Sequence, residues 1–170
     1  MLEDVLVDIR TALRTNIAAA FNVQDAAFAA ADVTEFGVAL TLDDVATGSY
    51  IMGEIDTPPR ELPAIFLLAR GTESIPYFTA ETQLRHNIDV GIIVCDHDPE
   101  KVARRLYRSI EAMRRVLTQY VEHDGTNNVF QVDLQNVAYF ETVDLGTGSG
   151  FRRTKFGVIT ALFDERETRP

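Results

Sequence analysis

The stretch Ile88-Asp89-Val90-Gly91-Ile92-Ile93-Val94-Cys95, followed by the turn Asp96-His97-Asp98-Pro99, decides the fold of this chain. The first run is short, rich in β-branched residues and bounded by a turn, so it predicts a mostly buried strand that begins near Leu84. After the turn, apolar residues recur at steps of three and four, which predicts an amphipathic helix from Pro99 to about Val121. Asp98 and Pro99 suit the N-cap and the first helical position.

The residues before this unit predict one clear helix and a less regular region. Apolar residues repeat at every fourth position from Val5 to Ile17, which predicts a helix over residues 2–21. Residues 22–60 are interpreted as an irregular, insertion-like region, whose Ala-rich first part fits either a helical extension or a loop. Within it, alternation over residues 36–42 predicts a strand, and Tyr50-Ile51-Met52 predicts a brief one.

Residues 62–69 read as a further buried strand, with Pro63 at its start, where a missing amide does least harm. Residues 70–82 are polar and predict an exposed, mobile connection. Two long strands over residues 129–144 and 151–163 predict a hairpin with a projecting tip. The charged tail 165–170 is expected to fray.

Together these elements predict a single α+β domain over residues 1–170. Its sheet is expected to be mixed and largely antiparallel, with two main helices packed on one face and a long C-terminal β-hairpin. A helix of about 23 residues, at about 1.5 Å per residue, runs back along the whole sheet. The strand after it can therefore run parallel to the strand before it.

The net charge of −10 is concentrated in the first half of the chain. Residues 1–100 hold 5 Lys and Arg against 17 Asp and Glu, so this half repels polyanions at long range. Cys95 is the only cysteine, which excludes an intrachain disulfide and favours a reducing compartment. No apolar run approaches the roughly 20 residues of a membrane span, so we expect neither membrane insertion nor export.

The turn Cys95-Asp96-His97-Asp98 is the one cluster of metal-ligand or acid–base side chains. Adjacent turn residues point in different directions, and no second ligand set completes a tetrahedral shell. A structural interpretation is therefore favoured, in which Asp98 caps the helix and Cys95 fills the core. His86, His97 and His123 are scattered outside any nucleophile motif, so no catalytic, cofactor-binding or metal-binding residue is expected.

The long helix has a basic outer face within an acidic protein. The favoured interpretation is a solvated face that pairs with acids of the same chain. The alternative is a contact surface for an acidic neighbour, such as an adjacent copy, and nucleic-acid binding is the least favoured. The candidate subunit contacts on this face are Arg104, Arg105, Arg108 and Arg115, and Lys101 and Arg114 lie on it too.

The turn Gly146-Thr147-Gly148-Ser149-Gly150, followed by Arg152 and Arg153, superficially suggests a phosphate cradle. It lacks a GKS or GKT sequence and precedes a strand where a phosphate loop precedes a helix. A hairpin turn is therefore the favoured interpretation.

The order of elements resembles the small tail-terminator and tail-completion (neck) proteins of long-tailed bacteriophages. The resemblance rests on the helix 2–21, the Leu62-Pro63-Ala64-Ile65 strand, the strand that ends in Asp96-His97-Asp98, the helix Pro99–Tyr120 and the hairpin Val129–Phe163. It covers residues 2–21 and 62–164, and its motifs are apolar patterns without catalytic groups.

The resemblance implies a structural virion protein, made in the host cytoplasm, that forms a ring, usually a hexamer, at the head-proximal end of the tail tube. Its partners would be copies of itself, the tail-tube protein and the head–tail connector or stopper, while DNA passes through the channel without specific binding. Gly146, Thr147, Gly148, Ser149, Gly150, Arg152 and Arg153, with the connection 70–82, are then candidate inter-ring contacts. The alternatives are a head-completion or neck adaptor protein, and a small enzyme or ligand-binding domain that uses the Cys95–Asp98 turn.

Overall fold

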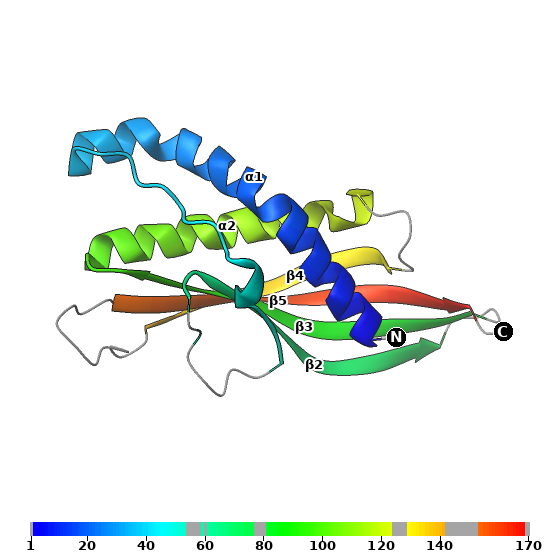
Figure 1. Cartoon of the computed structure of the whole chain (residues 1–170). Helices are drawn as coiled ribbons and strands as arrows, with labels where there is room; N and C mark the ends of the chain where they lie inside the picture. The colour runs from blue at the N-terminus through cyan, green and yellow to red at the C-terminus, as the bar shows by residue number, and fades with distance from the viewer. Residues whose placement is uncertain are drawn as a thin grey trace.

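The computed structural model describes residues 2–53, 59, 61–76, 81–123, 129–141 and 153–168 (Figure 1). Two long helices lie against one sheet. The elements in chain order are α1 (Leu2–Phe36), the 3-10 turn η1 (Thr47–Ser49), β1 (Tyr50–Met52), β2 (Ala64–Pro76), β3 (Glu81–Asp96), α2 (Pro99–His123), β4 (Val129–Glu141) and β5 (Arg153–Thr168).

The sheet has five strands in the order β1-β2-β3-β5-β4. β1 pairs parallel with β2, and the three other neighbouring pairs are antiparallel. Since β3 and β4 both run antiparallel to β5, the strand after α2 runs in the same direction as the strand before it. The predicted α+β class and mixed, largely antiparallel sheet are confirmed, and β4 and β5 pair as the C-terminal hairpin requires, with its tip outside the described residues.

Both helices cover the same face of the sheet (Figure 1). The predicted apolar stripe of α2 is fully buried, and on β3 alternate residues from Ile88 to Val94 are buried beneath it. α2 approaches the sheet closely at Gly157 of β5, where a Cβ would lie 2.9 Å from Ile110 Cδ1. A glycine is therefore needed for this close contact.

Residues 22–36, treated from sequence as part of an irregular region, belong to α1. This part of the helix is rich in alanine and has few charges, so it shows no polar outer face from which a helical period could be read. Its inner side carries Asp32, a buried acid, where a large apolar residue would have continued the stripe of the first half.

The predicted strand 36–42 is wrong, because Phe36 ends α1 and the segment after it joins no strand. The segment is nevertheless anchored to α1: the backbone N–H of Leu40 donates to Asp32 (3.1 Å), and that of Leu42 donates to Asp25 (3.0 Å). Two side-chain carboxylates thus satisfy the amides that a neighbouring strand would otherwise satisfy.

The polar connection predicted over residues 70–82 is largely strand. β2 continues to Pro76 and β3 begins at Glu81, so the two strands pair along an arm that reaches from Gly71 to Thr82. The tail expected to fray after residue 164 likewise continues β5 to Thr168 by pairing with the start of β3. The predicted brief strand Tyr50–Met52 is confirmed as β1.

Within the described residues, no helix combines the length and the apolar run needed to cross a membrane.

Candidate interaction surfaces

The buried centre of the contact between α1 and α2 is an ion pair. The guanidinium of Arg108 donates to both carboxylate oxygens of Asp32, at 2.8 and 2.5 Å, and the Asp32 side chain is 0% exposed. Arg108 also lies over the ring of Phe28, 4.7 Å from its centroid. The hydrogen bond from Arg108, opposed by burial, holds the pKa of Asp32 below its ordinary value.

The next two basic residues of α2 also pair within the chain. Arg104 donates to Glu35 (2.5 Å) and Glu100 (3.1 Å). Arg105 donates to Asp43 (2.5 Å) and forms an ion pair with Asp96 (3.1 Å). These contacts support the interpretation in which the basic face pairs with acids of the same chain.

Arg115 differs from the other candidate subunit contacts. It is exposed and makes no ion pair with any residue in the described part of the chain. A contact between these arginines and another copy stays a prediction.

The candidate inter-ring residues lie mostly outside the description. Gly146, Thr147, Gly148, Ser149, Gly150 and Arg152 fall outside the described residues. Arg153 begins β5, is exposed and pairs in register with Asp96 at the end of β3. Its role therefore also stays a prediction.

The carboxylates of the turn after β3 hold the start of α2. Asp98 Oδ1 accepts from the backbone N–H groups of Glu100 (2.8 Å) and Lys101 (3.2 Å), and these bonds lower the pKa of Asp98. Asp96 accepts from the N–H of Asp98 (3.0 Å) and pairs with Arg105. Asp98 is the predicted cap of α2, and both carboxylates already have structural partners.

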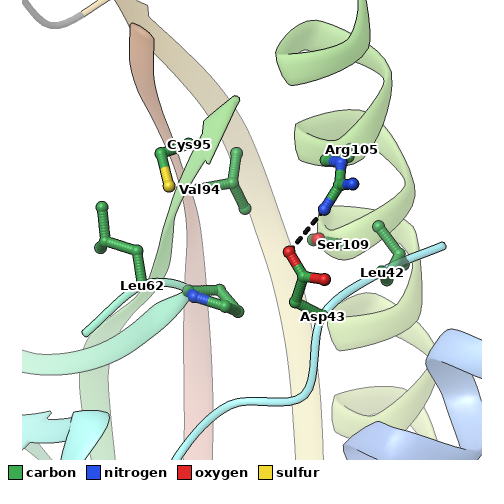
Figure 2. A pocket seen from close by; sticks show the side chains of 8 residues that line it. Leu42, Asp43, Leu62, Val94, Cys95, Arg105 and Ser109 are labelled. Carbon is green, nitrogen blue, oxygen red and sulfur yellow. Dashed lines mark hydrogen bonds and ion pairs between the residues drawn. The ribbon is translucent and has the colours of Figure 1, made fainter. Parts of the chain in front are cut away.

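A small cavity lies beside this turn (Figure 2). It is lined by Leu42, Asp43, Leu62, Pro63, Val94, Cys95, Arg105 and Ser109. Its volume is about 10 Å³, on the order of room for one water molecule. The Arg105–Asp43 pair crosses it, and no group of three or more potential metal ligands occurs among the described side chains. The cavity is too small for an organic substrate.

A hydrogen-bonded array of Thr72, His86 and Glu165 joins three strands. Thr72 Oγ1 lies 2.9 Å from His86 Nδ1, and His86 Nε2 lies 2.8 Å from Glu165 Oε2. His86 is 1% exposed, whereas Thr72 is exposed. Sequence reasoning missed this array because its members are separated by 14 and 79 residues and become neighbours only through the strand register.

Hydroxyl, imidazole and carboxylate in this order are the constituents of a nucleophilic triad. Neither the cavity beside the turn nor a second, larger one of about 280 Å³, lined by Gly48, Ser49, Ile51, Pro59 and Glu61, includes a residue of this array. A buried histidine also needs hydrogen-bond partners for both ring nitrogens, and Thr72 and Glu165 supply them.

The edge strand β4 carries aromatic side chains on both faces of the sheet. On the helix-covered face, Tyr139 makes an edge-to-face contact with Tyr107 of α2, with centroids 5.0 Å apart. On the other face, Phe140 stacks on Phe156 at 4.6 Å. Tyr107, Tyr139 and Phe140 remain 55%, 49% and 44% exposed. Partial burial, with the neighbouring Tyr107, raises the pKa of Tyr139.

No protein-family model matches this chain, and no curated protein sequence matches it significantly.

Proposed function

We propose that this protein is a structural component of a bacteriophage tail, a ring-forming tail terminator at the head-proximal end of the tail tube. The observation that carries the proposal is the order of elements: a helix, an antiparallel strand pair, a long amphipathic helix and a C-terminal strand pair on one sheet. The resemblance drawn from the sequence rests on this order of elements, and the proposed function rests on that resemblance.

The disposition of polar groups supports a role based on shape. Arg104, Arg105 and Arg108 of α2 are engaged in ion pairs with acids of the same chain, and the cavity that Arg105 lines has room for about one water. Groups held in this way fix the positions of α1 and α2 relative to the sheet. A rigid subunit of this kind is suited to repeat as identical copies in a ring.

The charge distribution supports a channel that DNA crosses without binding. The acid excess lies in the first half of the chain, where exposed Glu3 and Asp4 begin α1. Acids lining a channel repel the phosphate backbone and keep the moving duplex from adhering. On this proposal the subunits stop tube growth and present one ring face to the head–tail connector.

The test is reconstitution with tail-tube protein. We expect the purified chain to bind one end of preassembled tubes, to stop their elongation and to appear as a terminal ring in negative-stain micrographs. A chain that never joins tubes and leaves their length distribution unchanged would refute the terminator role. Binding to connector rings, with no effect on tubes, would favour the head-completion or neck adaptor role.

The Thr72–His86–Glu165 array favours one competing function, a small hydrolase with Thr72 as nucleophile. An organophosphonate that traps activated hydroxyl groups discriminates the two functions. A mass increase that disappears in the Thr72→Val variant would support the hydrolase. If the structural proposal is correct, neither the wild-type protein nor the Thr72→Val variant gains mass.

A further inference from the structure

β4 forms one edge of the sheet along its full 13 residues. Within the described chain no strand pairs with its outer side, so its outward N–H and C=O groups are available for a further strand. The two irregularities in its pairing with β5 lie at Val129/Gln131 and Leu134/Asn136. The segment from Asn136 to Glu141 is therefore the longest regular part of this edge.

Two exposed aromatic residues lie within that segment. Tyr139 and Phe140 are consecutive on β4 and project to opposite faces, each supported by a second ring, Tyr107 or Phe156. Large apolar side chains held in place by their neighbours are typical of the centre of a protein–protein interface. An edge strand with such anchors and free backbone groups can accept another strand.

The opposite edge of the same sheet offers a matching surface. β1 covers β2 only from Ile65 to Leu67, and beyond this no described strand pairs with the outer side of β2. Met52, at the end of β1, is an exposed large apolar residue. β2 runs antiparallel to β4, because each successive pair from β2 through β3 and β5 to β4 is antiparallel.

We infer that copies of this chain join edge to edge, with the β4 edge and its anchors Tyr107, Tyr139 and Phe140 docked on the β1–β2 edge of a second copy. The sheet then continues from copy to copy with antiparallel pairing. Because the two surfaces differ, the contact is head-to-tail, the type that closes into a ring when the rotation permits. The inference rests on the self-assembly proposed above and identifies the surfaces that carry it.

The size of the edge is sufficient. Thirteen residues at about 3.4 Å per residue make an edge about 44 Å long. A strip of that length needs a depth of only about 18 Å to reach the roughly 800 Å² per partner of a standard interface. The sheet together with the helix layer on one face provides that depth, since packed layers are about 10 Å apart.

The first test replaces one anchor. Tyr139→Lys places a charge at the centre of the proposed contact and should weaken self-association about tenfold or more, measured by sedimentation as a shift from oligomer to monomer. The matched control is Val33→Lys, an exposed apolar residue of α1 that belongs to neither edge strand, which should leave the oligomer unchanged. Far-UV circular dichroism verifies that both variants fold.

The second test reports the geometry without disturbing an anchor. In a Cys95→Ser background, Glu73→Cys on β2 and Gln131→Cys on β4 place one thiol on each edge, at the same level of the sheet through the pairs Glu73–Arg85, Arg85–Asp164 and Asp164–Gln131. A flexible bis-maleimide applied to the assembled protein should give a ladder of linked chains. Each single-cysteine variant should give none.

The outcomes separate this inference from the proposed function. If the Tyr139→Lys variant still assembled and the two cysteines gave no ladder, the edge-to-edge contact would be refuted, whereas the proposed ring would stand. Dimers from Gln131→Cys alone would show a two-fold contact between β4 strands and overturn the head-to-tail arrangement. A wild-type chain that never self-associates, alone or on tubes, would refute both the ring and the edge-to-edge contact.

Discussion

The two flanks of α2 carry different kinds of side chain, charged on one and aromatic on the other. Toward α1, its side chains are arginines, and Arg104, Arg105 and Arg108 meet acids of α1, of the segment after it and of α2 itself. Toward β4, Tyr107 meets Tyr139, and both rings stay about half exposed. The flank with the greater charge is thus already satisfied within the subunit, and the uncharged aromatic flank is the one left open to a partner.

The largest expected effect concerns the satisfied flank. Asp32→Ala leaves the Arg108 guanidinium buried without its partner, and such a change costs about 3–5 kcal/mol of unfolding free energy. It also removes the acceptor for the Leu40 amide, which loosens the segment after α1. Urea denaturation measures the loss.

The control for this prediction is Arg114→Ala, which removes an exposed i,i+3 pair with Glu111. That variant should lose about 0.5 kcal/mol or less. Equal losses in the two variants would contradict the distinction between a buried and a solvated ion pair on the same helix.

The next effect tests how tightly α2 packs near its aromatic flank. Gly157 pairs with Tyr139, and a Cβ there would lie 2.9 Å from Ile110 and 3.3 Å from Leu106. Gly157→Ala should therefore cost about 1–3 kcal/mol by overpacking, measured by thermal or urea unfolding.

Gly91→Ala is the matched control for that packing, because its Cβ would meet Phe66 on the face without helices. The Phe66 ring is half-buried and can turn toward solvent, so this variant should cost less although its nearest contact is shorter. A larger loss at Gly91 than at Gly157 would show that the uncovered face is the more rigid of the two.

A smaller effect is expected from the aromatic pair itself. A double-mutant cycle with Tyr107→Ala and Tyr139→Ala should give a coupling energy of about 0.5–1.5 kcal/mol in the unfolding of the isolated subunit. Both variants should impair self-association more than folding. If the variants were strongly destabilised but still assembled, the side chains of Tyr107 and Tyr139 would stabilise the subunit and not the contact between copies.

The smallest expected effect is a change in acid sensitivity. Because the pKa of folded Asp32 lies below its ordinary value of 3.8, its contribution to stability is present above about pH 3.8 and is lost as the pH falls toward the lower folded value. Asp32→Asn should flatten the decline of stability in this acid range. Tyr139→Phe should leave it unchanged, and an unaltered slope in Asp32→Asn would contradict the assignment.

The elements with a strong hydrophobic period could be predicted from sequence. The β3–α2 unit is predictable because its strand is a compact apolar run and its helix has one apolar stripe, with Asp98 as cap. The second half of α1 could not be predicted in this way, because it is rich in alanine and its one buried side chain is Asp32, so no apolar stripe marks it. The polar arm of β2 and β3 resembled a loop, since exposed strand pairs need no apolar alternation.

The contacts between distant residues could not be predicted in this way. The alternation over residues 36–42 predicted an extended chain, but the partners of its amides are Asp25 and Asp32 on α1, which no local pattern reveals. The basic face of α2 was visible in the sequence, whereas its pairing with Glu35 and Asp43 depends on the tertiary fold. The exposure of Tyr139 and Phe140 follows from the position of β4 at the edge, which the strand order alone decides.

Native mass spectrometry of the 170-residue chain, alone and bound to tail tubes, tests the central claim most directly. The account predicts a single closed oligomer of fixed stoichiometry, which Tyr139→Lys dissociates and Val33→Lys preserves. A chain that remains monomeric in both conditions, with all three proteins behaving alike, would contradict it.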